Sequence, residues 1–255
     1  MVESAPRRVQ SRRYSATLVR WVLAIERFMA QVGLSKLVYV LTGWPFALLL
    51  KLMVMRRNEI VVEGAENFSG DQGYFLLCNH ISMGEAPLLA AHFFPRPFWF
   101  PAKAEFFKNW FVGLVFATAT AWHAFPVRRG ERDMAAIRLI ETLLQKGDNI
   151  LLFPEGSRSE DGELGRGKKG VGMIIHNAQP QVLPVYVKGF DKIWLPGEKL
   201  PFGVGQRGRI VIGKPLQLDP WYEQKLNSEV GQGIVDEVMA AIAELKDRPE
   251  RLDAD

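Results

Sequence analysis

Residues 74–85 have the sequence YFLLCNHISMGE. An apolar run is followed by a histidine, His80, and five residues later by a glutamate, Glu85. The run Tyr74–Cys78 has the length and composition of a buried β-strand. His80 and Glu85 come next, and on one continuous helix they would lie about 140° apart and could not meet. A turn over residues 82–84, followed by a helix that begins near Glu85, would bring the two side chains together.

The predicted contact between His80 and Glu85 suits acid–base chemistry. The carboxylate would fix the tautomer of the ring and stabilise the imidazolium that forms when His80 takes a proton from a substrate hydroxyl. On this stretch alone, a histidine with a purely structural role at the end of a strand is an equal alternative.

The composition of the chain is that of a folded domain in a reducing compartment. The chain has 255 residues, of which 48% are hydrophobic, so it can build a sizeable core. Its single cysteine, Cys78, excludes a disulfide framework and a cysteine-based zinc site. Four scattered histidines include no pair with metal-ligand spacing, and we expect neither a metal nor a cofactor.

The positive charge is concentrated at the N-terminal end. The net charge is +4, but residues 1–57 carry ten basic and two acidic side chains, whereas the other 198 residues carry 22 basic and 26 acidic ones. This distribution indicates that the N-terminal end contacts an anionic surface. We expect this surface to be made of membrane lipids and not of nucleic acid.

Two segments at this end have the pattern of membrane-associated helices. Residues 14–32 are amphipathic, and residues 35–55 contain an uncharged stretch, Leu37–Leu50, that is shorter than the roughly 20 residues needed to span a bilayer. Two helices embedded in one leaflet fit this pattern best, and a helical hairpin packed on the core is the alternative. We therefore predict an anchor in residues 1–57 and a catalytic domain in residues 58–255.

From residue 60 onward, strand-like and helix-like stretches alternate. The predicted strands are residues 60–64, 74–78, 97–101, 122–127, 149–153, 182–187 and 209–212. The predicted helices are residues 85–94, 105–116, 131–146, 171–177 and 229–246, the last capped by Ser228. This alternation predicts an α/β fold, with a central mixed, largely parallel sheet covered by helices.

Polar side chains follow other predicted strands, at the edge where such sheets usually bind ligands. They are Arg128 and Arg129 after one strand, Glu155, Gly156, Ser157 and Arg158 after another, and Lys168 and Lys169 before a helix. Guanidinium groups and the N-terminus of a helix are both suited to binding a phosphate. Alternatively, Arg128 and Arg129 are a solvated surface pair without a ligand. Lys168 and Lys169 would then likewise belong to a solvated basic loop.

Taken together and in this order, these clusters resemble the sequence blocks of the glycerolipid acyltransferase family, which includes bacterial 1-acylglycerol-3-phosphate acyltransferases. Asn79-His80-x4-Glu85 is similar to the Asn-His-x4-Asp block of that family. Residues 153–159, FPEGSRS, are similar to Phe-Pro-Glu-Gly-Thr-Arg-Ser, and residues 127–130 and 183–185 lie where two further blocks are expected. The resemblance covers roughly residues 59–215, and an N-terminal two-helix membrane anchor ahead of these blocks is a further likeness to the family.

The resemblance implies a reaction, its substrates and the residues that serve it. His80 would be the general base, supported by Glu85, and would deprotonate an acceptor hydroxyl as it attacks the thioester of acyl-CoA or acyl-carrier protein. The acceptor would be a lysophospholipid, most simply 1-acylglycerol-3-phosphate, which gives phosphatidic acid at the cytoplasmic face of the inner (plasma) membrane. The residues expected to bind the substrates are Arg128, Arg129, Glu155, Gly156, Ser157, Arg158, Lys168 and Lys169.

The departures from the family pattern keep other functions open. Glu85 replaces the usual aspartate, and its extra methylene moves the carboxylate by about a bond length, when misplacements near 1 Å can cost ~10²-fold in rate. A different acceptor, such as another lysophospholipid or a lyso-ornithine lipid, and a catalytically silent lipid-binding relative are therefore alternatives. A hydrolase that uses Ser157 or Cys78 as its nucleophile is disfavoured, because no Gly-x-Ser-x-Gly elbow is present. Gly167 stands where a phenylalanine is common.

Overall fold

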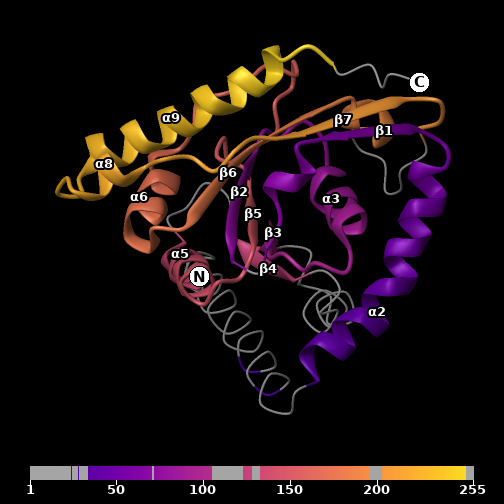
Figure 1. The fold of residues 1–255 in the computed structure, drawn as a ribbon, viewed down its shortest axis with the longest axis horizontal. Helices are drawn as coiled ribbons and strands as arrows, with labels where there is room; N and C mark the ends of the chain where they lie inside the picture. The colour runs from indigo at the N-terminus through magenta and orange to yellow at the C-terminus, as the bar shows by residue number, and fades with distance from the viewer. Residues whose placement is uncertain are drawn as a thin grey trace, which may run out of the picture.

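The computed structural model describes residues 34–70, 72–104, 123–127, 133–195 and 203–250, together with the single helical residues Ala24 and Phe28. Its centre is a five-stranded sheet, in the order β1 (Glu59–Glu63), β7 (Arg207–Ile212), β6 (Gln181–Lys188), β2 (Tyr74–Cys78) and β5 (Ile150–Leu152) (Figure 1). A second, parallel sheet has two strands, β3 (Phe100–Lys103) and β4 (Ala124–Val127). A bridge between Trp99 and Ile150 links it to β5.

The main sheet is mixed and largely parallel, as the sequence predicts. Pairs β1–β7, β2–β6 and β2–β5 are parallel, and β6–β7 is antiparallel.

Helices cover both faces of the sheet, and β2 shows why. Phe75 and Leu77 belong to the core on the side of α5, α6 and α9, whereas Leu76 and Cys78 belong to the core on the side of α2 and α3. Successive side chains of a strand point to opposite faces, so a fully apolar run needs cover on both. Figure 1 shows α3 and α2 on one side and α5, α6 and α9 on the other.

The described helices are α2 (Ser35–Leu50), continued by a π-helical turn (Lys51–Met55), a 3-10 turn (Ala65–Asn67), α3 (Glu85–Phe93), α5 (Met134–Gln145), α6 (Lys169–Ala178), α7 (Phe190–Ile193), α8 (Asp219–Tyr222) and α9 (Ser228–Asp247). Helix α5 is capped by Asp133, the residue before it, whose carboxylate accepts a hydrogen bond from the N–H of Ala136. The first turns of α5 and α6 line one cavity together with His80, which follows β2.

Several predicted boundaries shift in the structure. Strand β3 begins at Phe100, later than the predicted residue 97, because the chain from Pro97 to Trp99 is used to reach β5. Helix α9 is capped by the side chain of Asn227, which accepts two backbone N–H groups, and not by Ser228, which is its first residue. The predicted helix over residues 105–116 lies outside the described residues.

Helix α2 has two different sides. Ala47 and Leu50 pack into the core beside α3, while Leu41 and Trp44 are 64% and 57% exposed. Within the described parts of the chain, we find no helix with both the length and the apolarity needed to cross a membrane. The predicted first helix, residues 14–32, falls almost wholly outside the described residues, so the division at residue 57 stays a prediction.

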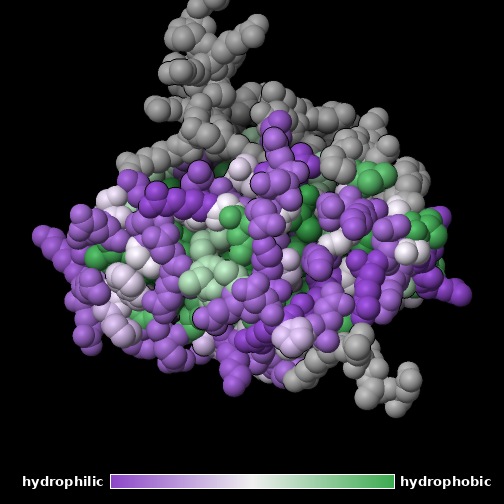
Figure 2. Space-filling model, turned by 90° about the horizontal axis from the view of Figure 1, so that it is seen from above, coloured by the Kyte–Doolittle hydropathy of each residue, from purple (hydrophilic) through white to green (hydrophobic). Residues whose placement is uncertain are grey.

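The exposed apolar side chains are unevenly distributed. Among the described residues, most of the large exposed ones belong to residues 28–52. Figure 2 looks onto the side that carries α9 in Figure 1, and this side is mainly hydrophilic, with apolar side chains in separate patches. The uneven distribution makes α2 the described element best suited to contact an apolar phase.

Candidate active site

The site is centred on His80, at the end of β2, and Glu85, the first residue of α3. The Nδ1 atom of His80 lies 3.3 Å from Oε2 of Glu85, and the two side chains are 7% and 0% exposed. This is an ion-pair distance without the alignment of a hydrogen bond. The contact predicted from the sequence is therefore present, and such contacts often tighten only when substrate is bound.

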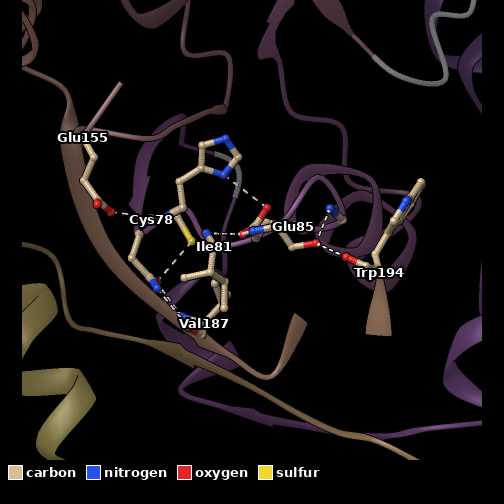
Figure 3. A network of polar contacts seen from close by, with 10 residues as sticks. Cys78, Ile81, Glu85, Glu155, Val187 and Trp194 are labelled. Carbon is tan, nitrogen blue, oxygen red and sulfur yellow. Dashed lines mark hydrogen bonds and ion pairs between the residues drawn. The ribbon is translucent and has the colours of Figure 1, made fainter. Parts of the chain in front are cut away.

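The turn between these residues is folded around the carboxylate of Glu85. Oε1 accepts the backbone N–H of Ile81 over 2.6 Å and also that of Ser82. A carboxylate at the first position of a helix is further favoured by the positive end of the helix dipole. One carboxylate oxygen is thus fixed by the backbone, and the other is left to face the imidazole (Figure 3).

Two side chains attach this turn to the rest of the protein. The amide of Asn79 pairs with both backbone groups of Val187 on β6, at 2.7 and 3.0 Å. The hydroxyl of Ser82 donates to the carbonyl oxygen of Trp194 over 3.0 Å and accepts the N–H of Gly84. These contacts hold the segment on either side of His80 in one position.

The imidazole of His80 is also held by the ring of Phe153. Its ring stacks on that of Phe153, with centroids 4.0 Å apart and planes 14° apart. The Nε2 atom of His80 is buried and has no hydrogen-bond partner among the described residues, and His80 is one of the residues that line a cavity. Nε2 is thus the ring nitrogen that does not face Glu85.

The motif from Phe153 to Ser159 divides into a buried part and an exposed part. Glu155 is 5% exposed, and its carboxylate turns toward the backbone beside His80. Gly156, Ser157 and Arg158 are exposed. Only the second group is therefore at the surface, where a substrate phosphate could reach it.

Lys168 and Lys169 lie at the start of α6, on the same side. Both are exposed, and the N–H of Lys168 donates to the carbonyl oxygen of Pro154 over 2.8 Å. The stem of Lys168 lies beside Gly156, because a methyl group added there would be 3.5 Å from Cγ of Lys168. The ammonium of Lys169 donates to the hydroxyl of Ser228 over 2.8 Å, which makes Lys168 the freer cation. Arg128 and Arg129 lie outside the described residues.

A cavity of about 620 Å³ opens beside His80 and runs between α5 and α6. Its walls are mainly apolar and include Ile137 and Ile140 of α5 and Ile174 of α6, with Leu152 of β5. Sequence reasoning missed this cavity, although the apolar faces of α5 and α6 were visible as three- and four-residue spacings. It also missed Asn79 as an anchor and Phe153 as the stacking partner of His80.

Cys78 is the residue before Asn79, and its thiol is fully buried. Burial raises the pKa of the Cys78 thiol well above its ordinary value, and the carboxylates of Glu85 and Glu155 raise it further. A thiol in this environment is not a nucleophile at neutral pH. No group of three or more His, Cys, Asp and Glu side chains with the arrangement of a metal site occurs in the described ranges.

Comparisons with known proteins agree with the sequence blocks. Residues 59–188 match the family model described as Acyltransferase. The chain is 29% identical over 168 residues to a 1-acyl-sn-glycerol-3-phosphate acyltransferase of Bacillus subtilis, a match that covers 66% of this chain and 78% of that protein. It is 29% identical over 163 residues to the chloroplastic enzyme of the same name from Arabidopsis thaliana, covering 62% of this chain and 44% of that protein.

The fold has a counterpart among solved structures. The crystal structure of the 1-acyl-sn-glycerophosphate acyltransferase from Thermotoga maritima superposes with a TM-score of 0.58 and covers 93% of this chain and 98% of that chain. The two sequences are 23% identical, so this likeness concerns the fold.

Proposed function

Because this chain belongs to the acyltransferase family, we propose that it moves a fatty acyl group from a thioester donor to the hydroxyl of 1-acylglycerol-3-phosphate, which gives phosphatidic acid. The names of the relatives in Bacillus subtilis and Arabidopsis thaliana support this choice of acceptor. The observation that carries the proposal is the buried pair of His80 and Glu85 beside a large apolar cavity.

The geometry suits a direct transfer without a covalent acyl-enzyme. Nε2 of His80 removes the proton of the acceptor hydroxyl as the oxygen attacks the thioester carbonyl carbon. The new C–O ester bond forms, the C–S bond breaks, and the imidazolium returns the proton to the departing thiolate. Glu85, held by two backbone N–H groups, stabilises the imidazolium through Nδ1.

The cavity supplies a place for the acyl chain of the donor. Its apolar walls, made by α5, α6 and β5, can cover a hydrocarbon chain whose thioester lies next to His80. The first turn of α6 also borders the cavity, and the positive end of a helix favours the negative charge that develops on the carbonyl oxygen. Parallel assays with acyl-CoA and with acyl-carrier protein identify which of the two is the donor.

The exposed rim of the site supplies partners for the acceptor. Arg158 and Lys168 offer cationic groups for its phosphate, and Gly156 and Ser157 offer a close backbone approach and a hydroxyl for its glycerol. We assign Arg128 and Arg129 the same task on the basis of the family pattern. Glu155 differs from these residues, because it is buried and its carboxylate accepts backbone N–H groups of the protein itself.

We further propose that the protein works at a membrane, on the cytoplasmic face of the inner (plasma) membrane. Leu37, Leu41 and Trp44 form an exposed apolar row on α2, and residues 1–57 carry an excess of eight positive charges. An apolar helix face inserts into one leaflet, and basic side chains favour the anionic cytoplasmic surface. Both features support a position of the site close to its lipid acceptor.

An acceptor panel tests the proposal. The purified protein is incubated with radiolabelled acyl-CoA or acyl-carrier protein and with lysophosphatidate, other lysophospholipids or a lyso-ornithine lipid, beside the His80→Ala variant. We expect label in phosphatidate with the wild type and none with His80→Ala. Transfer to another acceptor but not to lysophosphatidate would refute the proposed acceptor. No transfer to any acceptor would leave a lipid-binding relative as the better description.

A further inference from the structure

Glu155 belongs to the motif expected to bind the acceptor, but its carboxylate is turned away from the surface. Oε1 accepts the backbone N–H of His80 over 3.1 Å, and Oε2 accepts the backbone N–H of Gly165 over 2.9 Å. Figure 3 shows Glu155 and Glu85 on opposite sides of the segment that begins at Cys78. Both carboxylate oxygens are thus used by the protein itself.

Two hydrogen bonds join the backbone of His80 to this motif. Glu155 accepts the N–H of His80, and the N–H of Ser159 donates to the carbonyl oxygen of the same residue over 2.7 Å. Both backbone groups of His80 are therefore bonded to the loop that follows β5. Since β2 and β5 are neighbouring parallel strands, this loop extends their pairing beyond the last strand residues.

The end of this loop, near Gly165, contacts the same carboxylate. Gly165 has no side chain, and a methyl group at its Cα would lie 2.8 Å from Oε2 of Glu155, closer than such contacts allow. The chain thus approaches the carboxylate at a position where any other residue would push it away. Glu155, which follows β5, thus connects the segment that follows β2, at His80, with the end of the loop, at Gly165.

We propose that Glu155 is a positioning residue that holds the backbone of His80, and hence its imidazole, in register with Glu85 and with the cavity. The inference deepens the proposed acyl transfer and rests on it. A buried carboxylate whose two oxygens each accept a backbone N–H fixes the relative positions of these two groups, and at 5% exposure the residue presents little surface to the acceptor. The acceptor contacts fall instead to the exposed residues Gly156, Ser157 and Arg158.

The substitution Glu155→Gln separates positioning from acceptor binding. The amide has the same shape, but its NH₂ group meets a backbone N–H, so one of the two bonds is lost and the two donors repel each other. We expect kcat to fall about 10- to 100-fold, because displacements near 1 Å cost that much, while KM for lysophosphatidate stays within about twofold. The matched control is Glu163→Gln, which alters an exposed carboxylate of the same loop that pairs with Lys246.

A second variant tests the same contact without changing any charge. Gly165→Ala introduces the methyl group that crowds Oε2 of Glu155. We expect kcat to fall in the same direction, again with little change in KM. Thermal unfolding of each variant accompanies the kinetics, so that activity is expressed per folded molecule.

A readout on the ring itself is independent of turnover. The chain has four histidines, so their imidazole resonances can be assigned in ¹H–¹⁵N spectra by single substitution. We expect Glu155→Gln and Gly165→Ala to shift the resonances of His80 and to leave those of His176 unchanged. This measurement remains informative even if no acceptor is found, so failure of the proposed function is recognised separately.

Three outcomes would overturn the proposal. An increase in KM for lysophosphatidate with kcat preserved would mean that Glu155 binds the acceptor. Loss of activity only in proportion to the unfolded fraction would mean a general structural role. Unchanged His80 resonances in both folded variants would mean that the carboxylate does not set the position of the ring.

Discussion

The buried and the exposed halves of the site are built on different principles. His80, Glu85 and Glu155 are at most 5% exposed, and the carboxylates of the two glutamates are held by backbone N–H groups. Arg158 and Lys168 are exposed, and neither has a hydrogen bond or ion pair from its charged group among the contacts described. The first half has one fixed arrangement, whereas the second half is available to a ligand.

This difference separates chemistry from recognition. A base must be within bonding distance of the proton that it removes, so its position is fixed in advance by the surrounding backbone. A phosphate can be bound by long cationic side chains that order themselves when the ligand arrives. Substitutions in the buried half are therefore expected to lower kcat, and substitutions in the exposed half to raise KM.

The largest effect is expected where the buried half loses its proposed base, His80. We expect His80→Ala to lower kcat/KM about 10³-fold or more, within the range that general-base catalysis supplies. Initial rates of acyl transfer at saturating donor measure this effect. His176→Ala is the control, since the ring of His176 bonds to the carbonyl oxygen of Gln224 and does not border the cavity. Equal activity of both variants would remove His80 from the mechanism.

A smaller effect is expected when the carboxylate partner is shortened. Glu85 spans the distance between two backbone N–H groups and the imidazole, so Glu85→Asp cannot keep both contacts without a shift of the backbone. We expect kcat to fall about 10-fold or more, with KM unchanged, because ~1 Å of misplacement is enough. Full activity of Glu85→Asp would show that the backbone adapts to either residue.

The control for this change is Glu229→Asp. Glu229 also lies in the first turn of a helix, α9, but it is exposed and is not one of the residues that line the cavity. The same chemical change at this position is expected to leave kcat and KM within about twofold of the wild type.

The exposed half is tested by Arg158→Ala. Loss of a charge-assisted bond to the acceptor phosphate weakens binding by roughly 1.5 to 3 kcal/mol, so KM for lysophosphatidate is expected to rise at least about 10-fold with a smaller change in kcat. Arg207→Ala, which removes an exposed arginine paired with Glu59 and Glu250, is the control. A fall in kcat at constant KM would mean that Arg158 contributes to the chemical step and not to acceptor binding.

Local patterns predicted the part of the site that is close in sequence. The apolar run Tyr74–Cys78 predicted a central strand, and the five-residue interval from His80 to Glu85 predicted a turn that brings them together. Both features depend on neighbouring residues. Their boundaries were therefore correct to within a residue or two.

Features that depend on distant parts of the chain were not predictable in this way. The bonds of Asn79 to Val187, which lies 108 residues later in the chain, require the register between β2 and β6. The direction of Glu155 depends on the return of the loop to Gly165, and the motif itself does not contain that information. The cavity results from the distance between α5 and α6, which each helix pattern leaves undetermined.

The smallest effect on activity is expected at Cys78, which is buried between the two carboxylates and has no catalytic task. Because burial raises the pKa of its thiol, the thiol stays protonated at pH values where a free cysteine is already partly thiolate. We expect the folded protein at pH 8 to resist iodoacetamide and the urea-unfolded protein to react fully, as measured by mass. Cys78→Ala should keep kcat and KM within about twofold of the wild type. Rapid alkylation of the folded protein with parallel loss of activity would restore a cysteine-dependent mechanism and with it the hydrolase alternative.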